Sequence, residues 1–402
     1  MSSSAAPSAN IVDVLVIGAG PAGSTAALTL ARAGVNVRMV DRARFPREKL
    51  CGDTVNPGTL ALLDRLGPGA PLRERAQAIT GMVVTGPGGA AIHADYPDGL
   101  KGAAVTRREL DLLLVEAATR SGARFDAGVM VRAPLVGERH RLAGVRVAAG
   151  SADHDIYAKV VIAADGRHSR LAFHLGLARY AATPKRWAFG AYYIGVEGMG
   201  TRGEMHLRTD GYIGLAPLAG GVTNVCVVRE LQTAFRAHRM DAEQVVQAAI
   251  DGDPQLRDRF TRARQVSEVV SLGPLAVDAK AAGYPGLLLA GDAAGFVDPM
   301  TGDGLRFAIR GGELAAEAAM RELQTGRSAH QELAAARQRE FAAKWRVNRS
   351  LRWLTTSPRA LSVAAAIAPR WRGPFERVIG IAGDCAIANE PADHKAPAPQ
   401  SA

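Results

Sequence analysis

The first apolar run of the chain, VDVLVIG at residues 12–18, shows no polar alternation. A run of this kind is typical of a strand buried on both faces of a parallel sheet. The Ala/Leu-rich stretch from Ser24 to Ala33 predicts a helix, and Gly34 ends it. The next run, VNVRMVD, predicts a second strand that ends on Asp41. The pattern therefore begins with a strand–helix–strand unit, which indicates the α/β class.

Two later apolar runs have the same character. The run YAKVVIAADG predicts a strand that ends at Asp165 and Gly166, and LLLAGD predicts another that ends at Asp292. A loop containing glycine and proline follows the second run, and a helix is expected to begin near Gly302 and Gly304. Between the two strands the chain changes to short β-like runs with glycine turns, and beyond them it is Ala/Glu/Arg-rich and helical.

Three glycines, Gly18, Gly20 and Gly23, follow the first strand at G-x-G-x-x-G spacing. In such a loop the first glycine permits a tight turn, the second lets the backbone approach a pyrophosphate, and the third lets the helix pack close to the strand. The start of the helix attracts phosphate through its unpaired N–H groups. Asp41 follows at a distance where a carboxylate can accept from ribose hydroxyls. The unit predicts a dinucleotide site but does not decide whether the dinucleotide is FAD or NAD(P).

Composition places the chain among ordinary globular proteins: 402 residues, of which 48% are hydrophobic and 22% charged. The cysteines Cys51, Cys226 and Cys385 are too scattered for a disulfide framework or a metal site, which favours a cytoplasmic setting without a metal. No apolar run approaches the ~18 residues of a membrane span.

The net charge of +10 fits a solvated surface, but it also fits an acidic carrier protein or a membrane surface as partner. A location peripheral to the membrane therefore stays open. Aromatic content of 5% and the absence of a recognised motif argue against nucleic acid as a partner.

Three segments resemble motifs of one FAD-dependent family, which includes geranylgeranyl reductases, aromatic-ring hydroxylases of the p-hydroxybenzoate hydroxylase type and flavin-dependent halogenases. GAGPAG resembles the ADP-binding loop, DGRHS the DG motif and GDAAGFVDPMTGDG the GD motif, and the three occur in family order. TRRELDLLLVEAATRSG resembles the family's Arg-x-x-hydrophobic-Asp helix, with Arg107 as the arginine that contacts FAD. The resemblance implies a resident FAD, and either NAD(P)H as a transient electron donor or a separate flavin reductase.

The resemblance also implies roles for single residues. Asp292 is expected to bind the ribityl chain, and Pro299 with the Gly302–Gly304 loop is expected beside the isoalloxazine ring. There the positive end of a helix would stabilise the negative charge of reduced flavin. Where the family often has an arginine after the DG motif, this chain has Ala172, which leaves an NADPH contact from this motif open. The expected cofactor-binding residues are Gly18, Gly20, Gly23, Asp41, Arg42, Cys51, Gly52, Arg107, Asp165, Gly166, Gly291, Asp292, Pro299, Gly302 and Gly304.

Pattern and resemblance together predict an α/β fold in which a Rossmann-like FAD-binding domain carries an inserted mixed β-sheet substrate lobe and C-terminal helices. The expected boundaries are residues 10–78, 101–178 and 276–330 for the discontinuous FAD-binding domain, 79–100 and 179–275 for the substrate lobe, 331–388 for the C-terminal helical region, and 1–9 and 389–402 for disordered tails.

The stretch FPREKLCGD resembles the Pro-x-x-Lys-x-Cys-Gly loop of the geranylgeranyl reductases, which lies at the flavin edge. Two roles for Cys51 are open. In the first, Arg47 and Lys49 favour a reactive thiolate. In the second, Gly52 lets the backbone pass under the cofactor, and the cysteine is only part of the loop. The second role is favoured.

The candidates for the lining of a substrate pocket are His206, Tyr192, Tyr193 and Tyr212, and Pro217 fits the family's apolar-Pro step that faces the flavin. The catalytic candidates are Cys51 of the loop, Pro217, His206 and Tyr212.

Three reactions on a small organic substrate are consistent with these residues. The resemblance implies an aromatic residue near position 214, where this chain has Gly214. The missing side chain suggests a roomy pocket and favours an NAD(P)H-using monooxygenase of a small or lipophilic molecule. The Cys51 loop favours the alternative, an FAD-dependent reductase of C=C bonds. Halogenation is least favoured, because no Trp-x-Trp-x-Ile-Pro segment exists and the halogenase lysine has no counterpart.

Overall fold

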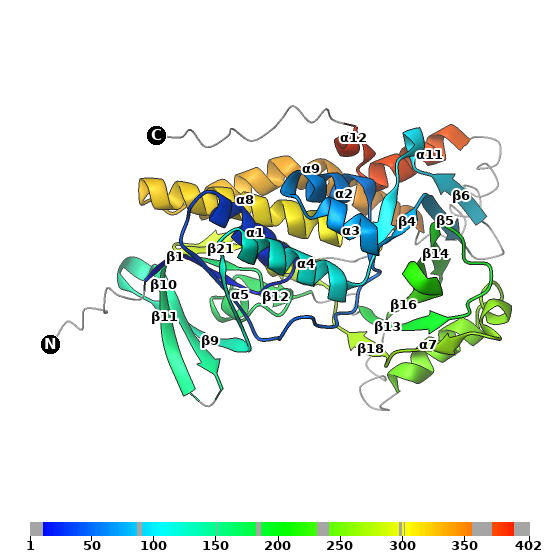
Figure 1. Ribbon diagram of the computed structural model, residues 1–402, viewed down its shortest axis with the longest axis horizontal. Coiled ribbons are helices and arrows are strands. Elements are labelled where there is room, and N and C mark those ends of the chain that lie inside the picture. Colours follow the sequence, from blue (N-terminus) through cyan, green and yellow to red (C-terminus); the bar gives the residue numbers. More distant parts are fainter. Residues whose placement is uncertain are drawn as a thin grey trace.

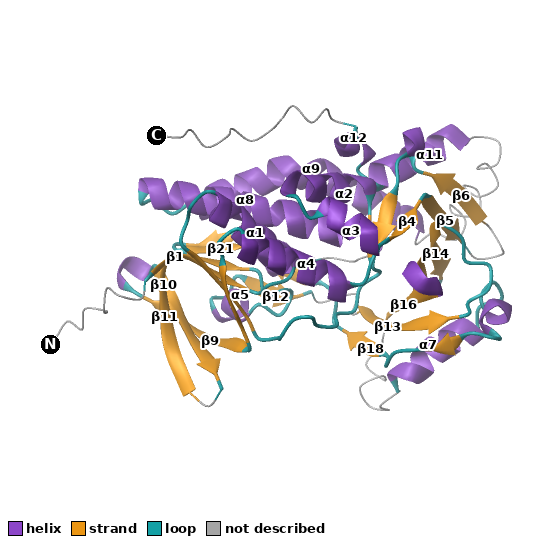
Figure 2. Cartoon of the chain, viewed as in Figure 1, coloured by secondary structure: helices purple, strands orange, loops and turns teal. Residues whose placement is uncertain are grey.

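A computed structural model describes residues 11–86, 91–150, 152–181, 186–230, 241–296, 300, 302–355 and 372–389. Pro299 and almost all of the expected tails lie outside the described residues. A helix-covered α/β body and a second β-sheet lobe lie side by side (Figures 1 and 2). The predicted fold class is confirmed.

The main sheet has the strand order β20-β21-β11-β1-β2-β8. Its central strand β1 pairs in parallel with both β11 and β2, and Val14, Leu15 and Val16 are fully buried. Burial on both faces explains the unbroken apolar run at this point of the sequence. The strands are β1 (Val12–Ile17), β2 (Val37–Asp41), β8 (Arg124–Ala127), β11 (Ala152–Ala163), β20 (Gly283–Tyr284) and β21 (Leu287–Leu289).

Each face of this sheet has its own covering layer. Helices α1, α4 and α8 pack on one face, where Val14 and Val16 join their core. The antiparallel strands β9 and β10 continue from β11 and cover the other face, where Leu15 and Ile17 lie. These elements are α1 (Pro21–Arg32), α4 (Arg107–Arg120), α5 (Arg170–His174), α8 (Gly304–Thr325), β9 (Val129–Val136) and β10 (Leu142–Ala149).

The second sheet has the order β17-β13-β16-β15-β14-β5-β6, with β18 paired to β13. It is mixed, because β5 runs parallel to β14 while its other pairings are antiparallel. Helix α7 (Ala242–Asp251) packs on one face through Val246 and Ile250, and Asp241 caps it. The strands are β5 (Gly81–Thr85), β6 (Ala91–Asp95), β13 (Arg186–Ile194), β14 (Arg202–Arg208), β15 (Gly211–Pro217), β16 (Val222–Glu230), β17 (Arg264–Gln265) and β18 (Val270–Leu272).

Short elements connect the two sheets. They are the three-stranded sheet of β3 (Thr54–Val55), β7 (Gly102–Ala104) and β4 (Gln77–Ile79), the pair β12 (Ala178–Tyr180) and β19 (Val277–Ala279), and the helices α2 (Pro57–Leu66) and α3 (Gly69–Arg75). Strand β3 follows directly on the loop that contains Cys51, so this loop crosses from the first sheet toward the second.

A buried lysine ties the C-terminal helices to the start of α8. Helix α9 (His330–Thr355) carries Lys344, whose ammonium group donates to the carbonyl oxygens of Ile381 (2.7 Å) and Ala382 (2.9 Å). The same nitrogen lies 3.0 Å from Asp303 Oδ1 and 3.1 Å from Asp384 Oδ2. These contacts hold α11 (Arg372–Ala382) and α12 (Cys385–Ala388) beside the N-terminus of α8.

The close approach of α1 and α8 gives a test of the packing. A Cβ atom on Gly312 would overlap the Ala22 backbone oxygen, whereas one on neighbouring Gly311 would meet the end of the Arg337 side chain at 3.2 Å and make an ordinary contact with Gly291 N at 3.8 Å. We expect Gly312→Ala to lower the free energy of unfolding by roughly 1–3 kcal/mol, because the two helices must separate. Gly311→Ala, the matched control, should leave it unchanged or raise it by up to ~1 kcal/mol through helix propensity. Urea denaturation midpoints measure both, and equal effects would contradict this packing.

Candidate active site

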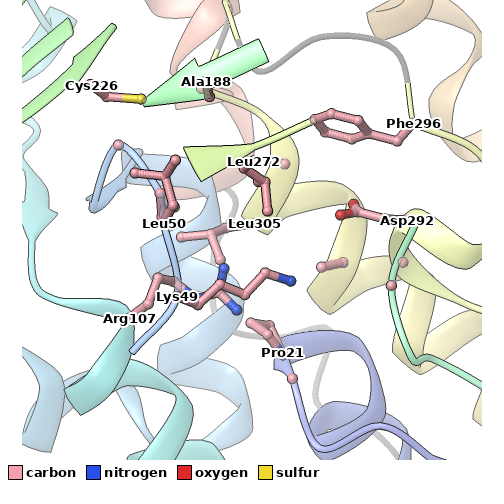
Figure 3. Close-up of a pocket in the computed structure, with 18 of the residues that line it drawn as sticks. Pro21, Lys49, Leu50, Arg107, Ala188, Cys226, Leu272, Asp292, Phe296 and Leu305 are labelled. Carbon is pink, nitrogen blue, oxygen red and sulfur yellow. The ribbon is translucent and has the colours of Figure 1, made fainter. Parts of the chain in front are cut away.

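A cavity of about 920 Å³ lies between the two sheets, at the upper end of the size range of small-molecule sites. One part is lined by the glycine loop after β1 and by the polar ends of β2, β11 and β21. The other part is apolar and is lined by residues of the second sheet and the C-terminal helices, among them Met82, Val84, Ile92, Leu207, Leu215 and Ile379. In Figure 3, Pro21 and Asp292 belong to the first part, and Ala188 and Cys226 lie across the cavity from Pro21.

The expected cofactor-binding residues gather around the first part of this cavity. All of them line it except Gly23, which lies behind the glycine loop, and Pro299, which is outside the described residues. The three signature segments are far apart in the sequence. The parallel sheet brings them together, because the carboxyl ends of β1, β2, β11 and β21 meet at one edge.

The glycine loop is built for close backbone approach. Gly18 has a left-handed φ of 93°, and a Cβ on it would overlap Ala164 O. A Cβ on Gly23 would overlap Gly18 O, so neither position accepts a side chain. Gly20 differs, because a Cβ there would meet no protein atom closer than Arg47 Nη2 at 3.5 Å. The protein itself therefore leaves room at Gly20, on the cavity side, where a cofactor phosphate is expected.

Polar groups around the cavity fit the rest of a flavin nucleotide. Asp41 accepts hydrogen bonds from the backbone N–H groups of Ala19 (2.7 Å) and Ala43 (2.8 Å), which fixes the glycine loop against the end of β2. Asp165 lines the cavity, and its buried Oδ1 has no hydrogen-bond partner among the described residues. Such an atom carries a desolvation cost until a ligand bonds to it. Gly304 starts α8 at the cavity wall and directs the positive end of the helix toward it.

An ion cluster fixes the wall on the side of α4. The buried carboxylate of Asp111 accepts from Arg107 Nε (2.8 Å) and Nη2 (2.9 Å), one helical turn before it, and pairs with Arg47 Nη2 at 2.9 Å. Thr106 caps the helix and so places Arg107 in its first turn. Burial disfavours the charge on Arg107, but Asp111 and Cys51 together more than compensate and raise the pKa of the guanidinium. Arg107 is therefore a permanent cation at the cavity wall.

Lys49 extends into the cavity from the loop of residues 45–56, with its ammonium group directed toward Asp292 (Figure 3). Burial lowers the pKa of Lys49, the nearby Arg107 lowers it further, and Asp292 opposes both effects. Asp292 lies at the end of β21 as expected, after Gly291, whose φ of 59° makes the turn.

The surroundings of Cys51 differ from the expectation that its basic neighbours favour a thiolate. Burial raises the pKa of the Cys51 thiol. The cation that counteracts this shift most is Arg107 of α4, rather than the sequence neighbours Arg47 and Lys49. Burial thus favours the protonated thiol, whereas Arg107 and the backbone N–H of Asp53 lower the pKa of Cys51 and so favour the thiolate.

The protein alone does not require glycine at position 52, so the expectation that Gly52 lets the backbone pass under the cofactor stays a prediction. Gly52 has no left-handed φ, and a Cβ added to it would have no protein atom within 4 Å. The strained residue of the loop is the next one, Asp53, with a φ of 53°. The sequence analysis missed Asp53, as well as Asn224 and the link from Arg47 to Asp111. A polar residue after Cys-Gly at a turn was the only available signal for Asp53.

The catalytic candidates separate into two groups. Cys51 and Tyr212 line the cavity, whereas His206 and Pro217 do not. The buried ring of His206 lies 2.8 Å from Thr85 Oγ1 and 2.9 Å from Glu204 Oε2, inside the second sheet. Burial alone would raise the pKa of Glu204, but hydrogen bonds from His206 and Arg259 lower it to about 2. This arrangement gives His206 a structural role.

Two further tyrosines on β13 point to opposite faces of the second sheet. Tyr192 hydrogen-bonds to Asp53 at 2.7 Å and lines a second cavity. Tyr193 donates to Gln265 Oε1 (3.0 Å), packs edge-on against Phe260 and lines neither cavity.

The described residues contain no group of three or more His, Cys, Asp or Glu side chains that could hold a metal ion. Among the same residues, no helix is long and apolar enough to cross a membrane. Contact with an acidic carrier protein or a membrane surface stays a prediction.

The glycine loop, the three strand ends and the cavity together define an FAD-dependent oxidoreductase, and the chain is thus an enzyme. More particularly, it belongs to the FAD binding domain family, whose model matches residues 11–349.

Curated relatives of the chain carry the names of two kinds of reductase. It is 32% identical over 371 residues to the menaquinone reductase of Mycolicibacterium smegmatis, covering 89% of this chain and 88% of the relative. It is 31% identical over 330 residues to the menaquinone reductase of Mycobacterium tuberculosis, covering 76% of each chain. The digeranylgeranylglycerophospholipid reductase of Methanosarcina mazei is 28% identical over 334 residues, covering 78% of this chain and 76% of the relative.

Solved structures share the fold at lower identity. The flavin-dependent brominase Bmp2 superposes with a TM-score of 0.81 at 20% identity, covering 93% of this chain and 94% of the brominase. A geranylgeranyl bacteriochlorophyll reductase-like protein from Thermoplasma acidophilum gives 0.77 at 23% identity, covering 89% of this chain and 91% of that one. These likenesses establish the fold and do not select a reaction.

The different surroundings of the three glycines give a test of the cofactor site. Gly20→Val should fold with nearly wild-type apoprotein stability, because the protein leaves room for the side chain. It should lose most of its bound FAD, because the side chain occupies the path of the pyrophosphate. The ratio of flavin to protein absorbance and urea denaturation of the apoprotein measure the two properties. Full FAD occupancy in a folded Gly20→Val protein would exclude this loop as the phosphate site.

Proposed function

We propose that this chain is an FAD-dependent reductase that adds hydrogen across a C=C bond of a lipophilic, polyprenyl-type substrate. The observation that carries the proposal is the position of Cys51, whose thiol pKa is raised by burial, in the wall of the cavity that joins the expected flavin site to an apolar part. The names of the relatives support the substrate class, since menaquinone and digeranylgeranylglycerophospholipid both carry unsaturated prenyl chains.

The apolar part of the cavity suits a hydrocarbon chain. Its lining residues come from β5, β6, β14 and β15 and from α11, and they offer few hydrogen-bonding side chains. Burial of hydrocarbon in such a cavity contributes roughly 0.8 kcal/mol per CH₂ group. A prenyl tail would therefore be bound mainly by the hydrophobic effect, with its double bond placed between the flavin site and Cys51.

When bound and reduced, FAD would supply a hydride at N5. The residues of this chain would supply the other half of the addition. As the π bond breaks and one carbon receives the hydride, the other carbon takes the proton of the Cys51 thiol, and two C–H bonds result. The thiolate left behind is stabilised by Arg107 and by the Asp53 N–H group. The permanent charge of Arg107 makes this stabilisation independent of pH in the neutral range.

The monooxygenase favoured by the sequence analysis is the second candidate, because the roomy cavity would also admit an oxygenated product. In both reactions the electrons would come from NAD(P)H, either bound transiently or through a separate flavin reductase. Halogenation has less support, because the brominase resemblance extends only to the fold.

The two candidates predict products of different mass. We expect the holoenzyme, reduced under argon and given a prenylated menaquinone or a geranylgeranyl glycerophospholipid, to add two hydrogen atoms to the prenyl chain. For menaquinone the quinol is first reoxidised to the quinone, and fragment masses then assign the two hydrogen atoms to the chain rather than the ring. The same product should form under ¹⁸O₂ without the label, because hydride addition needs no oxygen. Incorporation of ¹⁸O, with no product under argon, would overturn the reductase proposal in favour of the monooxygenase.

The role of Cys51 has its own test. Cys51→Ser should keep FAD and be reduced normally, but its oxidation by substrate should slow at least ~10-fold, since a hydroxyl is a far weaker acid than a thiol. Cys226→Ser is the matched control, because Cys226 lines the same cavity from β16, and it should retain the wild-type rate. Stopped-flow absorbance of the flavin measures both half-reactions. An unimpaired Cys51→Ser enzyme would restore the loop role that the sequence favoured.

A further inference from the structure

Arg167 is a buried cation that the protein leaves without a partner. It comes directly after the turn of Asp165 and Gly166, and it lines the first part of the main cavity with an exposed fraction of 7%. Among the described residues it has no hydrogen bond and no ion pair, and its buried Nε atom has no acceptor. Burial lowers the pKa of the guanidinium, and the nearby Asp292 opposes this shift only in part. Such a charge costs free energy until an anion binds to it.

The other buried arginines that the structure describes are satisfied within the protein. Two are in ion pairs and the third donates to a carbonyl oxygen: Arg107 pairs with Asp111, Arg306 pairs with Glu340 at 2.7 Å, and Arg337 donates to Ala294 O at 3.3 Å. Arg167 is thus the exception, and its place in a cavity wall indicates that its partner is a ligand.

The turn that carries Arg167 packs directly on the glycine loop. A Cβ on Gly18 would overlap Ala164 O, just before this turn. The turn after β21 is as close to the start of α1, because a Cβ on Gly291 would lie 2.9 Å from Ala22 Cβ. The glycine loop and these two turns therefore surround one corner of the cavity.

This corner suits a pyrophosphate. Helix α1 begins here, so its unpaired N–H groups and its positive end face the corner, and Gly20 leaves room beside them. Arg47 and Arg107 also lie close to Gly20, but they share the carboxylate of Asp111. Arg167 adds a cation that has no ion pair with any described residue, and its planar guanidinium can donate to two phosphate oxygens at once.

We propose that Arg167 binds the pyrophosphate of FAD, and that the cofactor completes an ion pair of which the protein supplies only one half. The arginine is desolvated before FAD arrives, so binding gains the attraction to phosphate without a second desolvation of the guanidinium. Among the expected cofactor-binding residues this turn contributes only Asp165 and Gly166, so Arg167 is an additional one. Its role does not depend on which reaction the flavin then carries out.

The first test measures affinity. Arg167→Met nearly keeps the length of the side chain and removes its charge. We expect its dissociation constant for FAD, measured by quenching of flavin fluorescence in titrations of the apoprotein, to rise at least ~10-fold, since a charge-assisted hydrogen bond to phosphate is lost. ADP carries the pyrophosphate but no flavin, and its affinity, measured by competition with FAD, should fall by a similar factor.

Two further variants calibrate this result. Arg179 of β12 carries the same charge on the surface, where it pairs with Asp278 at 3.5 Å, and it lines neither cavity. Arg179→Met is therefore the matched control and should bind FAD and ADP as the wild type does. Arg167→Lys keeps the charge without the planar fork, so its affinities should lie between those of the wild type and Arg167→Met.

The second test measures stability, and without FAD the sign of the effect should reverse. The wild-type apoprotein carries the uncompensated charge, so we expect the urea denaturation midpoint of the Arg167→Met apoprotein to be higher than that of the wild type. Addition of the same concentration of FAD should raise the midpoint less in the variant, because stabilisation by a ligand follows its affinity. A variant apoprotein that is less stable than the wild type, or that does not fold, would make Arg167 a structural residue and overturn the proposal.

The two ligands also identify the group that Arg167 contacts. Weaker binding of FAD with unchanged binding of ADP would place the arginine at the flavin end and contradict the proposal. Unchanged binding of both would overturn it as well. In that case, weaker binding of NADPH or of a geranylgeranyl glycerophospholipid to the Arg167→Met holoenzyme would assign the arginine to a phosphate of the electron donor or of the substrate instead.

Discussion

The buried carboxylate of Asp111 is the charge on which the site depends. It is fully buried, and it binds Arg107 of its own helix and Arg47 of the 45–56 loop. Removing one partner from a buried ion pair typically costs about 3–5 kcal/mol, so this loop is held firmly against α4. Lys49, Cys51 and Asp53 lie in this loop, so the ion pairs of Asp111 also fix their positions. Arg107, oriented by the same carboxylate, is the cation that most lowers the pKa of the Cys51 thiol.

The glycines near the cavity serve two different needs. Gly18 and Gly23 are required by the protein, because any Cβ there would overlap its own backbone. Gly20 and Gly52 meet no such limit, yet both line the cavity. Gly18 and Gly23 are therefore needed for the strand–turn–helix unit to fold. Gly20 and Gly52 matter for the space that is left to a ligand. The sequence alone cannot distinguish a glycine required for folding from one required for ligand binding, because all four positions are glycine.

The fold was largely predictable from the sequence, because buried strands and glycine turns leave local patterns. Asp41, Asp165 and Asp292 stand at strand ends that parallel topology must bring to one edge. The environment of Cys51 was not predictable. Tyr192 and Asn224 are 139 and 171 residues from Asp53 along the chain, and no local pattern records such contacts. For the same reason the sequence did not predict that Arg107, rather than Arg47 or Lys49, has the largest effect on the Cys51 thiol. Nor did it predict that the His206 ring hydrogen-bonds to Thr85 and Glu204 inside the second sheet.

The proposed reductase function would place two different demands on one site. Hydride delivery to a hydrocarbon needs an apolar surface, and the apolar part of the cavity supplies one. The proton must come from a protein group, because an apolar substrate brings none. The loop of residues 48–51 lines this cavity and also a second one, and Asn224 bonds both the Cys51 carbonyl oxygen and Asp53. One short loop therefore carries the thiol that would give the proton, together with contacts from the second sheet that fix its position.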